Sequence, residues 1–175
     1  SFEGNNIPVI KSNFKQIFSP QTAYQMTSIL EGVIQRGTGK RLRDLNLQIA
    51  GKTGTTNNNT DTWFIGFTSN LVVGVFVGYD SPKKLGKYET GSKTALPIFK
   101  DFIKKAANNY DARPFKISKG IKMMVIDAET GEKADFGSKK TIIESYKKEK
   151  FENQTFISND KYKSDIYKKN ILKFY

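Results

Sequence analysis

Residues 49–56 read IAGKTGTT and hold the residue types that two kinds of chemistry require. A Gly-Lys-Thr triplet occurs in the loops that cradle phosphate groups in nucleotide-binding proteins. A Lys-Thr-Gly triplet supplies a cation, a hydroxyl and a position without a side chain, as one wall of an acyl-transfer site would. The two interpretations predict different neighbours along the chain, so the flanking residues distinguish them.

The neighbours exclude the nucleotide loop. A phosphate-binding P-loop requires G-x-x-x-x-G-K-[ST] between a strand and a helix. The position five before Gly51 is Asn46 instead of glycine, and residues 54–59 after Thr53 read GTTNNN, which cannot begin a helix. Both the first glycine and the helix N-terminus that would bind phosphate are therefore missing.

The same stretch suits the exit of an edge strand. Gly51 and Gly54 would let another backbone approach closely. The amine of Lys52 and the hydroxyls of Thr53 and Thr55 match an extended peptide that ends in a free carboxylate. The alternative is an ordinary strand end with glycines at a turn, because a three-residue pattern is common by chance.

The composition excludes several classes of site. The chain of 175 residues has no cysteine and no histidine, which rules out disulfides, thiol catalysis, zinc-thiolate sites and a Ser-His-Asp triad. We expect no metal and no cofactor. The net charge is +12, but arginine occurs only at positions 36, 41, 43 and 113. Because nucleic-acid recognition relies on arginine, we expect no nucleic-acid partner.

No apolar run approaches the roughly 20 residues of a membrane span. The first residues, SFEGNN, have neither the basic nor the apolar region of a signal peptide. We therefore expect membrane contact only through an N-terminal anchor of a longer parent protein that is absent here.

Two segments carry the apolar repeat of a helix. The first begins with Ser19 as N-cap and Pro20 as the first helical residue, and the turn at residues 37–39 stops it. The second follows Thr94 as its cap and tolerates Pro97 in its first turn. Their predicted buried faces are Ala23, Met26, Ile29, Leu30, Val33 and Ile34, and Leu96, Ile98, Phe99, Phe102 and Ile103.

Between these helices the apolar period changes to two. Leu45, Leu47 and Ile49 alternate with polar residues, after a charged connection at 40–44 that we expect to be exposed. Short turns force neighbouring strands to be antiparallel. The predicted class is α+β, of the α/β sandwich type. An antiparallel sheet with strands at about 45–55, 61–68 and 71–79 is flanked by helices at about 20–36 and 94–108.

The last third of the chain has weaker patterns. A hairpin-like piece runs from Ile121 to Lys133 and turns at residues 127–131. From Gly137 onward the chain is rich in Lys, Glu, Asn and Tyr, which predicts a solvated, disordered tail with at most one marginal helix. The expected division is 1–110 for the sheet and its helices, 111–136 for the hairpin-like extension and 137–175 for the tail.

Several motifs follow one another in a recognisable order. Residues 23–39 hold a helix and a Gly-Thr-Gly turn, 51–56 read GKTGTT, 61–66 read DTWFIG, 72–80 read VVGVFVGYD and 91–99 read GSKTALPIF. In this order they resemble the C-terminal part of the transpeptidase domain of class A, bifunctional penicillin-binding proteins, whose fold is shared with serine β-lactamases. One departure is Thr62, where that family usually has alanine. Residues 1–110 would then be the C-terminal portion of the domain.

The resemblance implies a serine-type D,D-transpeptidase of peptidoglycan biosynthesis. A serine attacks the penultimate D-Ala carbonyl of a stem peptide, and the acyl-enzyme is taken by an amine of a neighbouring strand. Lys52 would be a fixed cation over the nucleophile, and Thr53 and Thr55 would hold the terminal carboxylate. The backbone N–H of Thr55 would be one of two oxyanion-hole donors. Gly54 would keep the substrate's path clear.

The resemblance also implies parts that this chain does not supply. The nucleophile belongs to a Ser-x-x-Lys motif at a helix start, and strings of this form occur at 12–15, 81–84 and 158–161. None suits, because Ser12 precedes a strand-like run, Ser81 adjoins a proline in a loop and Ser158 lies in the polar tail. No Ser-x-Asn motif occurs. We therefore expect the fragment alone to be inactive, with Trp63 and Phe64 supporting its sheet.

The resemblance implies partners and a location as well. The partners are a stem peptide ending in D-Ala-D-Ala, β-lactams as covalent inhibitors, and the remainder of the transpeptidase domain. The location is the bacterial cell envelope, on the outer face of the cytoplasmic membrane. The alternative function is a non-catalytic envelope-binding module that uses the basic surface for anionic polymers.

Overall fold

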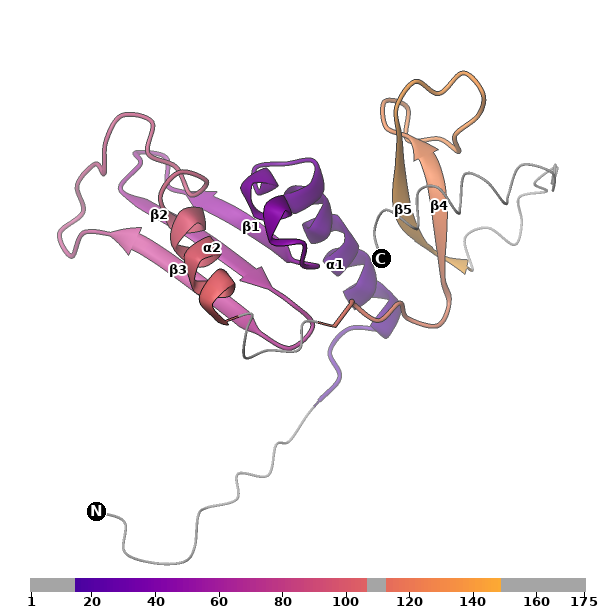
Figure 1. Ribbon diagram of the computed structural model, residues 1–175, viewed down its shortest axis with the longest axis horizontal. Coiled ribbons are helices and arrows are strands. Elements are labelled where there is room, and N and C mark those ends of the chain that lie inside the picture. Colours follow the sequence, from indigo (N-terminus) through magenta and orange to yellow (C-terminus); the bar gives the residue numbers. More distant parts are fainter. Residues whose placement is uncertain (1–14, 107–112, 149–175) are drawn as a thin grey trace, which may run out of the picture.

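The computed structural model describes residues 15–106 and 113–148, which form an α+β structure (Figure 1). Its elements are α1 (Pro20–Gln35), the 3-10 helix η1 (Lys40–Leu45), β1 (Ala50–Thr55), β2 (Asp61–Phe67), β3 (Val72–Gly78), α2 (Ala95–Ala106), β4 (Ile121–Asp127) and β5 (Thr141–Lys147). They form two antiparallel sheets, of order β1-β2-β3 and β4-β5. The predicted class and the central three-stranded meander are confirmed.

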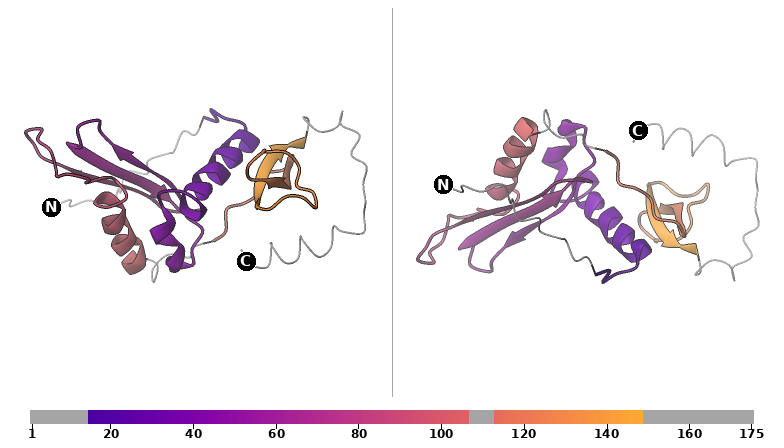
Figure 2. Two further views of the ribbon diagram at one scale, coloured as in Figure 1. Left: turned by 90° about the horizontal axis from the view of Figure 1, so that it is seen from above. Right: turned by 90° about the horizontal axis from the view of Figure 1, so that it is seen from below.

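The central sheet has two different faces, because side chains alternate along each strand. On β2, Thr62, Phe64 and Gly66 are buried, whereas Trp63 and Ile65 are exposed. Helix α2 lies against the buried face, as Figure 2 shows. The opposite face keeps an apolar strip open to solvent among the described residues.

Two phenylalanine rings fix α2 on the sheet. Phe64 and Phe99 are fully buried, and their ring centroids lie 4.7 Å apart at 65°, an edge-to-face contact. Gly66 makes this contact possible, since a Cβ there would lie 2.7 Å from both rings. The remaining members of the core are Ile34, Leu42, Ile49, Ala95, Leu96 and Ile103.

Helix α1 begins and ends where the sequence predicts. The Ser19 hydroxyl caps it by accepting from the backbone N–H of Thr22 at 3.2 Å, with proline as the first helical residue. At the other end the N–H groups of Gly37 and Gly39 both donate to the Val33 carbonyl at 3.0 Å. The Gly-Thr-Gly turn therefore ends the helix and leads the chain toward β1.

The predicted apolar faces of both helices are only partly buried. About half of the surface of four predicted members remains exposed: Met26, Ile29, Ile98 and Phe102. The prediction of complete burial is wrong at these positions, because none of the described elements lies over them.

The segment before β1 also differs from the prediction. Residues 40–45 form η1 instead of an exposed connection, and Leu42 is fully buried in the core. Leu45 belongs to η1, and Asn46 follows with a φ of 53°, which turns the backbone. The strand therefore begins at Ala50 and not at residue 45. Burial of Leu42 favours the helical turn, and the alternation at 45–49 does not reveal this.

A second sheet replaces the hairpin that ends at Lys133. The predicted turn forms, because the N–H groups of Glu129 and Thr130 donate to the carboxylate of Asp127 at 2.8 and 3.0 Å. These donors, Thr130 first, hold the pKa of Asp127 below its usual value. Beyond this turn only an isolated bridge joins Ile126 to Lys133, and the true partner of β4 is β5.

β5 lies where the sequence predicts a solvated tail, and that expectation is wrong for residues 141–147. The strand contacts α1, since Arg36 pairs with Glu144 at 2.7 Å and the Gln25 amide donates to the Ser145 carbonyl at 2.9 Å. Residues 149–175 lie outside the described residues. The division of the chain at residues 110 and 136 stays a prediction.

Truncation of the buried ring on α2 tests its role in the core. We expect Phe99→Ala to lower the free energy of unfolding by about 3–5 kcal/mol, because it leaves a cavity against Phe64. Phe102→Ala removes the same atoms from a half-exposed position of the same helix and should cost less than about 1 kcal/mol. Urea denaturation followed by circular dichroism measures both. Equal losses would contradict the assigned core.

Candidate functional site

The candidate site lies on β1, which is an edge strand of the central sheet. The N–H of Thr56, just after the strand, donates to the Asp61 carbonyl on the β2 side at 3.1 Å. Backbone groups alternate sides along an antiparallel strand. The N–H and C=O groups of Gly51, Thr53 and Thr55 therefore point to the edge that no described strand occupies.

The side chains of β1 approach this edge from both faces of the sheet. Thr53 pairs with Phe64 in the register, so its hydroxyl lies on the face that α2 covers, and Thr55 lies on the same face. Lys52 pairs with Ile65 and lies on the opposite, exposed face. Its amine donates to the Thr53 carbonyl at 3.1 Å. A cation, two hydroxyls and outward backbone groups thus surround one edge.

Both hydroxyls have a partner outside β1. The Oγ1 atoms of Thr38, in the turn after α1, and Thr53 are 3.0 Å apart. The Thr55 Oγ1 accepts from the backbone N–H of Gly91 at 3.1 Å. Gly91 must be a glycine here, because a Cβ would lie 2.7 Å from the carbonyl oxygen of Gly54. Sequence reasoning missed these contacts, because it assigned Thr38 only to a helix stop and Gly91 only to a motif.

A buried hydroxyl network holds the loop that carries Gly91. Thr94 donates to the Thr90 carbonyl at 2.8 Å, and its Oγ1 lies 2.6 Å from that of Thr62. Because the single Thr94 proton is committed to Thr90, Thr62 is the donor of this pair. This bond satisfies the fully buried Thr62, at the position where the sequence departs from the family pattern. The Thr94 hydroxyl thus bonds to Thr90 and Thr62, whereas the sequence predicts that it caps the helix.

The two aromatic residues of β2 serve different faces. Phe64 is a core residue, as predicted. Trp63 is 43% exposed on the uncovered face, where its ring packs 4.8 Å from that of Phe76 on β3. Its support of the sheet is therefore a cross-strand contact and not burial under a helix.

None of the described Ser-x-x-Lys strings has the geometry of a nucleophile motif. Ser81 lies in an exposed loop. A fourth string, at 145–148, which sequence reasoning missed, places the buried Ser145 within β5. Lys148 follows the end of β5 and is exposed, so this string does not place a serine at a helix start with a lysine one turn later that points inward. Ser12 and Ser158 lie outside the described residues.

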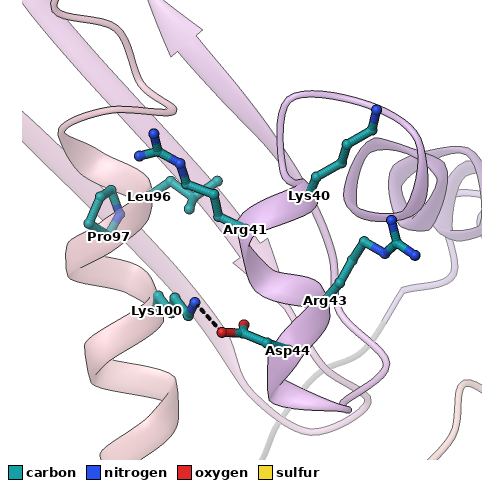
Figure 3. A pocket seen from close by; sticks show the side chains of 7 residues that line it. All are labelled: Lys40, Arg41, Arg43, Asp44, Leu96, Pro97 and Lys100. Carbon is teal, nitrogen blue, oxygen red and sulfur yellow. Dashed lines mark hydrogen bonds and ion pairs between the residues drawn. The ribbon is translucent and has the colours of Figure 1, made fainter.

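A pocket of about 800 Å³ lies between η1 and α2, apart from β1 (Figure 3). Side chains three apart eclipse on a 3-10 helix. Accordingly Arg41 and Asp44 extend toward α2, while Lys40 and Arg43 extend from the other side of η1. Lys100 pairs with Asp44 at 2.6 Å and holds the pKa of that carboxyl below its usual value. The cations around this pocket therefore do not converge on one point.

Glu31 on α1 is the described carboxyl with the largest change in pKa. Burial raises its pKa from 4.5 to about 7, because a partly desolvated carboxyl favours its neutral form. The residue lies one position before Gly32, in the part of α1 that leads to the Gly-Thr-Gly turn. Its charge is therefore coupled to the folding of this region.

Comparison with known proteins agrees with the motif order on and around β1. Residues 10–104, more than half of the chain, match the family described as penicillin binding protein transpeptidase domain. The chain belongs to this family. The resemblance that the spaced motifs indicate is thereby confirmed, and the antiparallel sheet with α2 is part of the transpeptidase fold.

Penicillin-binding proteins 1A are among the proteins that are similar to this chain. The chain is 42% identical to that of Rickettsia conorii over 156 residues, covering 87% of this chain and 19% of the relative. It is 40% identical to that of Pseudomonas aeruginosa over 136 residues, 77% of this chain and 16% of the relative. The crystal structure of penicillin-binding protein 1A from Haemophilus influenzae matches with a TM-score of 0.64 and 30% identity, covering 73% and 20%. The chain thus spans about a fifth of the length of these relatives.

The described residues lack two features. None of their helices is long and apolar enough to cross a membrane. No group of three or more carboxylates among residues 15–106 and 113–148 could hold a metal ion.

The raised pKa of Glu31 predicts a pH-dependent stability. Between about pH 4.5 and 7 the folded chain keeps this proton and the unfolded chain loses it, so the free energy of unfolding falls as pH rises through this range. Glu31→Gln should flatten the slope, whereas Glu132→Gln, at an exposed loop position, should keep it. Urea titrations at several pH values measure the slope. An unchanged slope in Glu31→Gln would contradict the assignment.

Proposed function

We propose that this chain forms one wall of the active site of a serine-type D,D-transpeptidase. The observation that carries the proposal is the edge of β1, where Lys52 approaches from one face and the hydroxyls of Thr53 and Thr55 from the other. An extended stem peptide would lie along this edge and pair with its outward backbone groups. The family to which residues 10–104 belong supports the same reaction class.

Each residue of the wall has a separate role. Lys52 draws the terminal carboxylate of the substrate and, over the serine of the parent, favours deprotonated groups. Thr53 and Thr55 hold the carboxylate through their hydroxyls. The outward N–H of Thr55 is an oxyanion-hole donor, a contribution of about 3 kcal/mol in such sites. Gly54 lies on the same face as Lys52, and the absence of a side chain keeps the approach open.

The reaction requires a longer protein. The serine attacks the penultimate D-Ala carbonyl, the terminal D-Ala leaves with a proton on its amine, and an amine of a neighbouring peptide then displaces the serine. The nucleophile and the Ser-x-Asn motif come from the remainder of the domain, since this chain spans about a fifth of its relatives. The chain is then the C-terminal part of the domain in a class A parent, which also carries a glycosyltransferase.

The uncovered surfaces of the fragment support this assembly. The exposed apolar residues of the sheet face are Trp63, Ile65, Val72 and Phe76, and both helices keep half-exposed apolar residues. Monomeric proteins rarely leave contiguous apolar patches of this kind open. The remainder of the domain would cover them. The parent would work in the cell envelope, on the outer face of the cytoplasmic membrane, with a membrane anchor of its own and β-lactams as covalent inhibitors.

Labelling with a fluorescent penicillin tests the function. We expect the complete parent to be acylated and this chain alone to remain unlabelled, because it lacks the nucleophile. In the parent, Lys52→Ala should lower the second-order acylation rate by about 100-fold or more, a loss typical of removing one electrostatic group from such a site. Gel fluorescence at several times measures the rate.

The matched control is Lys84→Ala, which removes an exposed lysine from the Ser-x-x-Lys string at 81–84 and should label like the unsubstituted parent. Labelling of the isolated chain that disappears on replacing Ser12 or Ser81 would contradict the proposal. Equal rates in the Lys52 and Lys84 variants would remove Lys52 from the site.

A further inference from the structure

The two threonines of the β1 edge differ from ordinary surface threonines in one respect: each hydroxyl oxygen is held by a group from another segment. Thr38 holds Thr53 at 3.0 Å, and Gly91 holds Thr55 at 3.1 Å. A hydroxyl has one proton to donate. The direction of these two bonds therefore decides what the edge can offer to a ligand.

The direction at Thr55 follows from chemistry alone. A backbone N–H can only donate, so the Thr55 oxygen is the acceptor of the bond from Gly91. The Thr55 proton finds no acceptor among the described residues and stays available to a ligand. Gly91 thus fixes Thr55 as a donor toward the edge.

The direction at Thr53 depends on Thr38. Either oxygen of this pair could donate to the other. When Thr38 donates to Thr53, the Thr53 proton is free to bond a ligand at the edge. The bond from Thr38 to Thr53 and the bond from Thr53 to the ligand then form a chain in which each bond polarises the other. An ionised carboxylate only accepts hydrogen bonds, and it therefore favours this arrangement.

We propose that Thr38 and Gly91 are positioning residues that turn both hydroxyls of the wall into donors, and so select a substrate with a free carboxylate. This inference rests on the proposed function. A peptide that ends in an amide or ester lacks the charge that makes such bonds strong. The edge discriminates against it at the two hydroxyls, in addition to the attraction of Lys52.

The segments that carry both positioning groups are held rigidly. Gly37 and Gly39 on either side of Thr38 donate to the carbonyl of Val33, at the end of α1. Gly91 lies directly on the backbone of Gly54, in a loop fixed by the buried hydroxyl bonds of Thr62, Thr94 and Thr90. A donor placed on rigid segments loses little conformational entropy when the ligand binds.

The experiment compares two probes in the complete parent protein: a fluorescent penicillin with its free carboxylate, and the methyl ester of the same penicillin. The ratio of their acylation rates reports carboxylate recognition and does not depend on how much of the protein is folded. We expect Thr38→Val to lower this acid-to-ester ratio about two- to threefold, because Thr53 keeps its own proton but loses the orientation and polarisation that Thr38 gives its hydroxyl. Thr38→Ser keeps the hydroxyl and should restore the ratio.

Three further variants complete the test. Thr27→Val makes the same change on α1, where the hydroxyl donates to the Ala23 carbonyl of its own helix and has no other partner among the described residues, and it should leave the ratio unchanged. In a parent that carries Thr53→Val, replacing Thr38 should have no further effect, because Thr38 acts through Thr53. Thr38→Ala provides the same comparison if the valine prevents folding.

The outcomes separate this inference from the proposed function. A parent that neither probe labels would overturn the proposed function itself. A parent that is labelled, with the same acid-to-ester ratio in Thr38→Val as in the unsubstituted protein, would overturn the role of Thr38 alone. Rates that fall equally for both probes would assign Thr38 a structural role only, and would also contradict the inference.

Discussion

The packing of Phe99 across Gly66 onto Phe64 is the contact on which the candidate site depends. It places α2 at a fixed height over the central sheet, because both rings are fully buried and no Cβ fits at position 66. The loop before α2 is then held within reach of β1, where Gly91 meets Thr55. A hydrophobic contact in the core thus positions a polar contact at the edge. The sheet register alone would not bring these two residues together.

The groups of the edge strand point in three directions. The backbone of alternate residues points outward in the plane of the sheet, Lys52 lies on one face, and the threonine hydroxyls lie on the other. An unpaired edge is usually a liability, since it can pair with any other strand. In the proposed function, the charge and the oriented donors give the edge a preference for one kind of chain end, so that strand pairing serves substrate recognition.

The sequence predicts the parts of this arrangement that depend on local patterns. Both helices, the three central strands and the Lys-Thr-Gly edge follow from periodicity and spaced motifs. The observed ends of these elements lie within a few residues of the predicted ends, except at the start of β1. Contacts between distant segments are different. The pairings of Thr38 with Thr53 and of Gly91 with Thr55 depend on tertiary placement, and a glycine or threonine carries no sign of its partner. β5 was not predicted for a related reason. The strand depends on its pairing with β4 and its contacts with α1, which the local sequence does not reveal.

The charge of the chain illustrates why the site cannot be found from residue type alone. Lysine is the principal cation of a protein with a net charge of +12, and Lys52 is one of many exposed lysines. Four cations, Lys40, Arg41, Arg43 and Lys100, line the pocket at η1, but the 3-10 geometry sends those of η1 to opposite sides. Lys52 differs in its surroundings and not in its charge. It stands beside an open backbone edge and opposite two hydroxyls whose oxygens are already held, and this combination gives the IAGKTGTT stretch its chemical capacity.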